Sequence, residues 1–294
     1  MKSEELKYWV GISGFMGMGF KRFQLLTKYF GSVEKVYKAQ VSEWMRVGIK
    51  RPMAINWDRW RRQTDLDRQM ERMERGLIKI ILIEDKEYPK LLKEIDSPPI
   101  ILYIKGRMEV LKRASLTVVG TRKMTEYGRR ATERLVGGLV KKGLVIVSGL
   151  ARGVDGWAHR VCLGNKGETI AVLGNGLDRV YPREHKGLAD QIIVSGGAVM
   201  TEYPLDYPIE RFNFPQRDRI LAGLSLGTLV IEGGVKSGTK ITANMAADYG
   251  REVFCVPGSI ESEVSKGTAE LIQTGAKLVV RAEDVLEEIS LPKI

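Results

Sequence analysis

Residues 116–159 constrain the fold more than any other stretch, because two short apolar runs there alternate with glycine turns around a helical pattern. The first run is β-branched and breaks at Gly120. Apolar side chains then recur at four-residue spacing over residues 127–139, and Gly143 follows where a helix would end in the left-handed conformation. The second run breaks at Ser148. The pattern predicts a strand, a helix and a second strand, which form one βαβ unit of a parallel sheet.

Small residues and an arginine occupy both turns of this unit. Open parallel sheets bind ligands at the carboxyl ends of their strands, where both turns lie. Small side chains expose backbone N–H groups, a following helix N-terminus favours anions, and a guanidinium can form paired hydrogen bonds with phosphate. We therefore predict a phosphate site, although each turn alone could equally be a tight turn with a solvated arginine. The candidate residues are Gly120, Thr121, Arg122, Ser148, Gly149 and Arg152.

The same alternation of strands and helices begins near residue 77 and continues beyond this unit. It predicts one extended Rossmann-like α/β domain over residues 77–294, with a doubly wound and mostly parallel sheet. A strand is predicted over residues 169–173, and its following turn contains Asn175 and Gly176. Later helices, each following a loop, are predicted over residues 216–224 and 241–249.

Residues 1–76 are predicted to form a separate all-helical domain. Two short helices joined by the glycine-rich residues 14–19 are in the style of a helix-hairpin-helix, whose turn can hold phosphate through backbone N–H groups. Close helix packing explains the same glycines, and we favour it because the turn contains no lysine or arginine. Trp44, Trp57 and Trp60 lie among basic residues and could stack on bases, but such tryptophans are more often core residues.

Composition narrows the class of protein. No run of about 18 apolar residues occurs, and the first residues lack the long apolar segment of a signal peptide, so we expect a cytoplasmic protein. The two cysteines, Cys162 and Cys255, lie in apolar patterns and are expected to be buried free thiols. Besides them the chain has His159 and His185 but no paired metal-binding motif, so no metal site is expected.

The charge balance favours a polyanionic partner. The chain carries 47 Lys and Arg against 36 Asp and Glu residues, a formal net charge of +11. Residues 1–78 hold 16 basic and 9 acidic side chains, so much of the excess lies there. Further cations flank the later loops. A single nucleotide would not need so many positive groups, whereas the successive phosphates of a single strand would use them all. These cations are Arg217, Arg219, Lys236 and Lys240, the last two on either side of Ser237, Gly238 and Thr239.

Three signatures of nucleotide binding or hydrolysis fail at identifiable positions. The first turn reads GTRKMT rather than GxGxxG, and the second strand ends in Ser148 rather than in an acid for a ribose. Residues 233–240 read GGVKSGTK, in which Thr and Lys have the wrong order for a Walker loop. No GxSxG motif occurs. NAD-binding, ATPase and α/β-hydrolase functions are therefore excluded.

Six segments resemble, in the same order, the motifs of the DNA processing protein A family, also called DprA or Smf. They extend over about residues 78–280, and the helical N-terminal region is similar to the sterile-alpha-motif-like or helix-hairpin-helix extension of that family. No winged-helix extension is expected after the last strand. The segments are VGTR at residues 119–122, SGLARGVDGWAH at 148–159, AVLGNGLDRVYP at 171–182, FPQRDRILAGLS at 214–225, TLVIEGGVKSGTKITA at 228–243 and VPG at 256–258.

The resemblance implies a homodimeric protein that binds single-stranded DNA without a cofactor and without catalysing a reaction. It further implies that the protein protects incoming DNA and loads the RecA recombinase during natural transformation. By position, Arg122 and residues 237–239 would hold backbone phosphate, while Arg217 and Arg219 would line the same pocket and Phe214 could stack on a base. The implied DNA-binding residues are Gly120, Thr121, Arg122, Ser148, Gly149, Arg152, Asn175, Gly176, Phe214, Arg217, Arg219, Lys236, Ser237, Gly238, Thr239 and Lys240.

Some positions depart from the wording of the family. Asp218 stands where asparagine is usual, and an added carboxylate beside two arginines is expected to weaken the attraction for phosphate. His185 also replaces an asparagine, and residues 268–270 differ from the usual pattern, which leaves the role of their loop open.

Alternatives remain open. Each arginine could form a salt bridge with Glu202, Asp218 or Glu232 instead of holding phosphate. A Rossmann-like N-glycosidase that cleaves nucleoside monophosphates could use Glu202 or Glu232 as its catalytic carboxylate, although the PGGxGT wording of those enzymes is missing. A docking scaffold without DNA contact is a third possibility.

Overall fold

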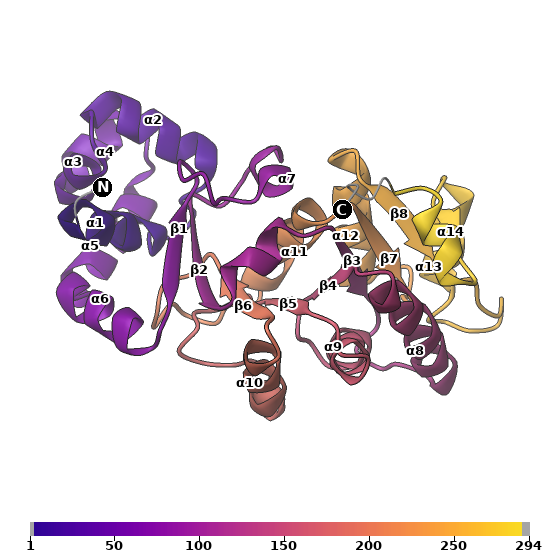
Figure 1. Ribbon diagram of the computed structural model, residues 1–294. Coiled ribbons are helices and arrows are strands. Elements are labelled where there is room, and N and C mark those ends of the chain that lie inside the picture. The colour runs from indigo at the N-terminus through magenta and orange to yellow at the C-terminus, as the bar shows by residue number, and fades with distance from the viewer. Residues whose placement is uncertain (1–2, 290–294) are drawn as a thin grey trace.

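Six short helices form the N-terminal part of the protein in the computed structural model, which describes residues 3–289 (Figure 1). Trp44 and Trp57 are fully buried between these helices, and the ring of Phe15 stacks on Trp57 at a centroid distance of 5.0 Å. These tryptophans therefore belong to a hydrophobic core. The helices are α1 (Ser3–Ser13), α2 (Phe20–Phe30), α3 (Val33–Lys38), α4 (Val41–Arg46), α5 (Arg51–Gln63) and α6 (Leu66–Arg75).

The glycine-rich turn between α1 and α2 is closely packed. Gly14 lies against the ring of Trp60, where a Cβ would overlap the indole. The indole N–H of Trp57 donates a hydrogen bond to the carbonyl oxygen of Met16 at 2.9 Å, and Arg22 donates to the carbonyl oxygen of Gly17. The structure thus agrees with the packing interpretation of these glycines.

A nine-stranded sheet with the order β1-β2-β6-β5-β4-β3-β7-β8-β9 forms the remainder of the fold. Only β2 runs antiparallel to its neighbours, β1 and β6, and the other pairs are parallel. The predicted mostly parallel sheet is confirmed. The strands are β1 (Lys79–Leu82), β2 (Ile101–Gly106), β3 (Ser115–Val119), β4 (Val145–Ser148), β5 (Thr169–Val172), β6 (Ala198–Thr201), β7 (Gly227–Val230), β8 (Glu252–Cys255) and β9 (Lys277–Leu278).

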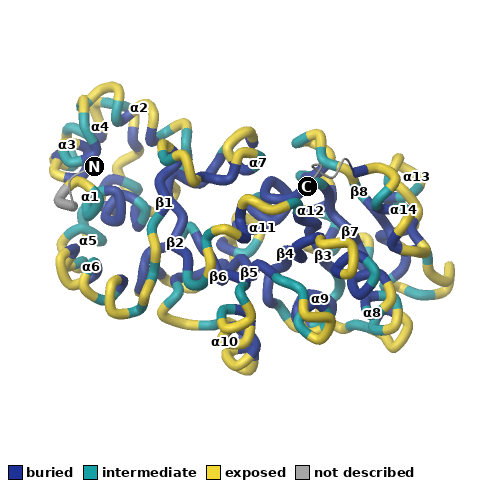
Figure 2. The backbone as a smooth tube through the Cα atoms, in the orientation of Figure 1, coloured by how far each residue is buried: buried dark blue, intermediate teal, exposed yellow. Residues whose placement is uncertain are grey.

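Helices cover both faces of the sheet, as a doubly wound fold requires (Figure 1). Every residue of the central strands β3, β4, β5 and β7 is consequently buried (Figure 2). One face carries α8 (Glu126–Lys141), α9 (Val154–Gly164) and α10 (Lys186–Val194), and the other carries α11 (Asn213–Leu224) and α12 (Gly238–Asp248). The remaining elements are α7 (Lys90–Lys93), η1 (Met108–Lys112), η2 (Arg183–His185), α13 (Lys266–Gln273) and α14 (Ala282–Leu286).

Two helices begin three residues earlier than predicted. α11 begins at Asn213, because Pro215 falls in its first turn, where no backbone N–H is needed. α12 begins at Gly238, so the predicted loop contributes its last residues to the first helical turn. At Gly143, by contrast, φ is +84°, which confirms the predicted left-handed end of α8.

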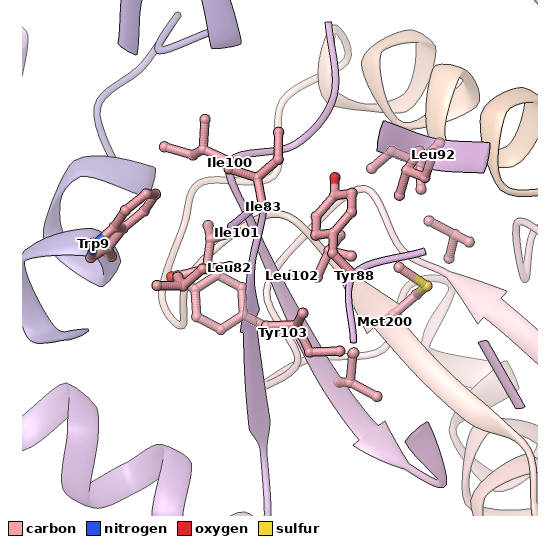
Figure 3. Packing of buried hydrophobic residues seen from close by; sticks show 14 of the residues in the cluster. Trp9, Leu82, Ile83, Tyr88, Leu92, Ile100, Ile101, Leu102, Tyr103 and Met200 are labelled. Carbon is pink, nitrogen blue, oxygen red and sulfur yellow. The ribbon is translucent and has the colours of Figure 1, made fainter. Parts of the chain in front are cut away.

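The helical region and the sheet share one hydrophobic core. Trp9 of α1 belongs to the same cluster as Leu82, Leu102 and Tyr103 of the first two strands (Figure 3). The hydroxyl groups of Ser13 and Tyr103 are hydrogen-bonded at 2.7 Å. The division into two domains at residue 76 stays a prediction.

Two further expectations concern single residues and membranes. Cys162 and Cys255 are buried free thiols, as predicted. Within residues 3–289 no helix is both long enough and apolar enough to cross a bilayer.

Candidate nucleic-acid interface

A pocket of about 310 Å³ lies at the carboxyl edge of the sheet between β3 and β7. At this point the strand order reverses, since the chain passes from β3 through β4, β5 and β6 on one side and returns to β7 on the other. Doubly wound sheets bind ligands at such switch points. The predicted site residues that line the pocket are Gly120, Thr121, Arg122, Arg217, Ser237, Gly238 and Thr239.

Backbone hydrogen bonds join the loops around this pocket. The N–H of Thr121 donates to the carbonyl oxygen of Glu232 at 2.8 Å, and the N–H of Val154 donates to the carbonyl oxygen of Thr121 at 3.2 Å. Gly153 has φ of +73°, and a Cβ there would overlap the carbonyl oxygen of Thr121. Only glycine permits this close approach, so the loops after β3, β4 and β7 form one rigid frame.

The N-terminus of α12 opens into the pocket without a side-chain cap. Ser237 occupies the N-cap position, but its hydroxyl makes no capping hydrogen bond. That hydroxyl is buried and has no hydrogen-bond partner among the described residues. The first N–H groups of a helix need an acceptor, and an anion is favoured there. Arg122 is exposed at the same pocket and forms no ion pair within residues 3–289. Together these groups offer the hydrogen-bond donors and the positive charge that suit a phosphate.

Arg217 has a different environment from Arg122. Its guanidinium is buried and donates hydrogen bonds to the carbonyl oxygens of Gly149, at 2.7 Å, and of Val172. Its Nε donates to Asp218 at 3.1 Å. Arg217 therefore fixes the ends of β4 and β5 and is largely neutralised by Asp218, as a buried charge requires. The predicted salt-bridge alternative is realised for this residue, although the side chain still lines the pocket.

Two carboxyl groups border the pocket. Burial raises the pKa of Asp155 to about 6, although the nearby Arg217 opposes this shift. Burial also raises the pKa of Asp218, while Arg217 and Arg122 oppose the shift. Asp218 is among the residues discussed from the sequence, but Asp155 is not. An acid in the first turn of a helix that follows a glycine-rich strand end is the signal that could have identified Asp155.

An aromatic pair extends the pocket on one side. A narrow hollow of about 50 Å³ shares Arg122 and Arg217 with the main pocket and is also lined by Arg152, Phe214 and Tyr181. The rings of Phe214 and Tyr181 lie 5.5 Å apart between centroids. Aromatic side chains beside a phosphate site can stack on bases. Tyr181 is not among the predicted site residues, because only folding brings it to Phe214.

Several predicted site residues contact other parts of the protein. The hydroxyl of Ser148 donates to the carbonyl oxygen of Val118 at 2.7 Å. The amide of Asn175 donates to the carbonyl oxygens of Gly176, at 2.9 Å, and of Arg179, at 2.7 Å, and so shapes the loop after β5.

Some of the predicted cations form ion pairs within the protein, and others do not. Arg219 does not line the pocket and pairs with Glu202, because two positions along a helix place it on the opposite face from Arg217. Arg152 pairs with Glu184. Lys240 pairs with Glu270 at 2.6 Å, so the atypical residues 268–270, which lie within α13 rather than in a loop, contact α12. Lys236 is exposed and forms no ion pair within residues 3–289.

The fold and the site together define a Rossmann-like protein with an uncapped helix N-terminus, an exposed arginine and a flanking aromatic pair at the carboxyl edge of its sheet. Residues 79–290 match the family described as DNA recombination-mediator protein A. The chain therefore belongs to this family, and the predicted resemblance to DNA processing protein A is confirmed.

Related proteins share the fold over nearly the whole chain. The chain is 43% identical to DNA processing protein DprA of Bacillus subtilis over 213 residues, which cover 72% of this chain and 71% of the relative. It is 36% identical to protein Smf of Synechocystis over 294 residues, which cover 98% and 74%. The X-ray structure of DprA from Streptococcus pneumoniae aligns with a TM-score of 0.82 at 35% identity, covering 97% of this chain and 99% of that one.

A second solved relative concerns nucleic acid. The structure of DprA from Helicobacter pylori, which describes the single-stranded DNA binding mode of that protein, aligns with a TM-score of 0.64 at 29% identity. The alignment covers 71% of this chain and 94% of that one.

Proposed function

We propose that this protein binds the backbone of single-stranded DNA at the pocket between β3 and β7. The uncapped N-terminus of α12, with the unpartnered hydroxyl of Ser237 beside the exposed Arg122, is the observation that carries this proposal. The neighbouring rings of Phe214 and Tyr181 offer stacking surfaces that suit any base. The single-stranded DNA binding described for the Helicobacter pylori relative supports the same function.

Binding of oligonucleotides over a salt series tests this proposal. Wild-type protein is expected to bind a single strand more tightly than a duplex, with affinity that falls as salt rises. The Arg122→Ala variant should bind several-fold more weakly, and its salt slope should fall by about one, as expected for the loss of one phosphate contact.

A matched variant controls for net charge. Lys142 is exposed just beyond the C-terminus of α8, which precedes the start of β4 and so lies at the opposite edge of the sheet. Lys142→Ala should leave the slope unchanged. If Arg122→Ala and Lys142→Ala change the slope equally, Arg122 does not hold a phosphate in this pocket.

We propose further that binding proceeds without a chemical reaction. Glu232, one candidate for a catalytic carboxylate, accepts hydrogen bonds from the backbone N–H of Thr125, at 3.0 Å, and from its hydroxyl. The other candidate, Glu202, pairs with Arg219. Incubation with AMP should release no adenine, and turnover that disappears in Glu232→Gln or Glu202→Gln would instead favour the N-glycosidase alternative.

We also propose that the protein acts as a homodimer in the cytoplasm, protects incoming single strands during natural transformation and loads RecA onto them. Membership of a family of recombination mediators supports this role. Light scattering across a concentration series tests the dimer. Addition of the protein should accelerate RecA filament assembly on DNA coated with single-strand binding protein, and unchanged assembly would contradict the loading role.

A further inference from the structure

A second, larger cavity lies between α10 and the strands β2, β5 and β6. Its volume of about 460 Å³ falls within the range of about 300–1,000 Å³ that ligand pockets occupy. The buried Leu173 and Val199 form its floor. The half-buried Leu177, Val180 and Ile193 supply accessible apolar surface. A flat apolar group of the size of a nucleobase suits such a cavity.

Cations surround this apolar lining. Lys105, Arg183 and Lys186 border the cavity and form no ion pair within residues 3–289. Arg179 also borders it but is engaged, because it pairs with Asp178 at 3.0 Å. Asp190 is the one bordering carboxylate without an ion pair in the described part of the chain, so the unpaired groups leave a net positive charge. An apolar interior with a positive rim suits an aromatic ligand that carries phosphate.

The cavity adjoins the narrow hollow that contains Phe214. Tyr181 lines both this cavity and the narrow hollow that contains Phe214. That hollow in turn shares Arg122 and Arg217 with the pocket at α12. The cavity at α10 and the pocket at α12 therefore both adjoin the narrow hollow that contains the two aromatic rings.

We infer that the cavity at α10 is a second nucleotide subsite for the same single strand. The strand turns around Tyr181, inserts one unstacked base against the half-buried Leu177, Val180 and Ile193, and places flanking phosphates on Arg183 and Lys186. This inference rests on the proposed binding of single-stranded DNA at the α12 pocket. Burial of a base in a cavity that is lined by apolar side chains adds affinity that the phosphate contacts alone do not supply.

A length series of oligothymidylates tests the subsite. We would measure affinity for strands of about 4 to 16 nucleotides, the range of sites in other single-strand grooves. The Arg183→Ala/Lys186→Ala variant should bind the shortest strands, which fill only the α12 pocket, like wild type. For strands long enough to reach α10, its salt slope should fall by about two and its affinity several-fold. Lys141→Ala/Lys142→Ala removes the same charge at the opposite edge of the sheet and should change neither quantity.

Photocrosslinking identifies the base directly. A strand that carries thiothymidine should form adducts, mapped by mass spectrometry, with residues 186–193 of α10 as well as with Phe214. Adducts at Phe214 without any on α10, or equal losses for both double variants, would overturn the subsite while leaving the α12 pocket intact. If wild-type protein binds no strand of any length, the proposed function itself fails, so the two outcomes are distinguishable.

Discussion

Glycine has opposite roles in the two glycine-rich regions of this protein. In the turn between α1 and α2, Gly14 makes room for the indole of Trp60, and the indole N–H of Trp57 donates to the carbonyl oxygen of Met16. At the carboxyl edge of the sheet, Gly153 instead makes room for a backbone carbonyl, while the hydroxyl of Ser237 has no hydrogen-bond partner within residues 3–289. Glycine in the first region serves packing, whereas glycine in the second region frames a site. Changes in the first should therefore alter stability, and changes in the second should alter binding.

The largest effect is expected from Trp57→Ala in the helical region. Trp57 is fully buried between Phe15 and Trp44, and its removal should lower the free energy of unfolding by about 3–5 kcal/mol. Urea unfolding followed by circular dichroism measures this loss. Tyr29→Ala, at a side chain that is 61% exposed, should cost no more than about 0.5 kcal/mol. Folded Trp57→Ala protein should bind a single strand like wild type, and weaker binding would show that the two regions are coupled.

Gly153→Val should affect both properties. The positive φ and the overlap with the carbonyl oxygen of Thr121 should together cost about 2–4 kcal/mol. Because the same overlap separates the loops after β3 and β4, single-strand affinity should fall in parallel. Gly164→Ala serves as a control. Gly153 is the N-cap of α9 and Gly164 is the last residue of the same helix, but no described atom lies within 4 Å of a Cβ at Gly164. Normal binding by Gly153→Val would show that the frame is not needed.

Ser237→Ala should separate stability from binding. A buried hydroxyl without a partner destabilises the free protein, so its removal should leave the free energy of unfolding unchanged or raise it by up to about 1 kcal/mol. Loss of its hydrogen bond to a phosphate should nevertheless weaken binding about tenfold. Ser148→Ala removes a hydroxyl that already donates to Val118, so it should lower stability and leave affinity unchanged. The same response in both variants would contradict a phosphate contact for Ser237.

The smallest effect is expected from pH. Burial raises the pKa of Asp155 to about 6, so its carboxyl group loses its negative charge as pH falls from 7.5 to 5.5. The pocket therefore gains net positive charge at the lower pH. Single-strand affinity should therefore rise a few-fold at the lower pH. Asp155→Asn should abolish this rise, and an equal rise in that variant would assign the effect to another group, such as Asp218, whose pKa burial also raises.

The raised pKa of Asp155 also makes the free energy of unfolding depend on pH. The sign of this dependence is opposite to that of a carboxylate whose pKa is lowered by an ion pair. The folded-state pKa of Asp155 lies above its usual value of 3.8, so the folded protein binds more protons between these two values. The free energy of unfolding should accordingly decrease as pH rises from about 4 to about 6 through this group.

Local pattern was sufficient to predict most of the fold. The β-branched runs and glycine turns identified the central strands, and Gly143 marked the end of α8 at the correct residue. Parallel order then placed the loops after β3, β4 and β7 at one edge, since crossovers by helices return each strand in the same direction. The boundaries of α11 and α12 were less accurate, because Pro215 and Gly238 disfavour a helix interior but are tolerated in a first turn.

The sequence by itself determined which loops meet at the edge of the sheet and that small residues and cations occupy them. Only the tertiary structure decided which cations remain available. In the structure Arg217 donates to the carbonyl oxygen of Gly149, and Arg219 pairs with Glu202. Arg122 forms no ion pair in the described chain, and Tyr181 packs beside Phe214. The physical reason is that local periodicity fixes the direction of a backbone segment, whereas the partner of a side chain is often a residue far along the chain that only packing brings near.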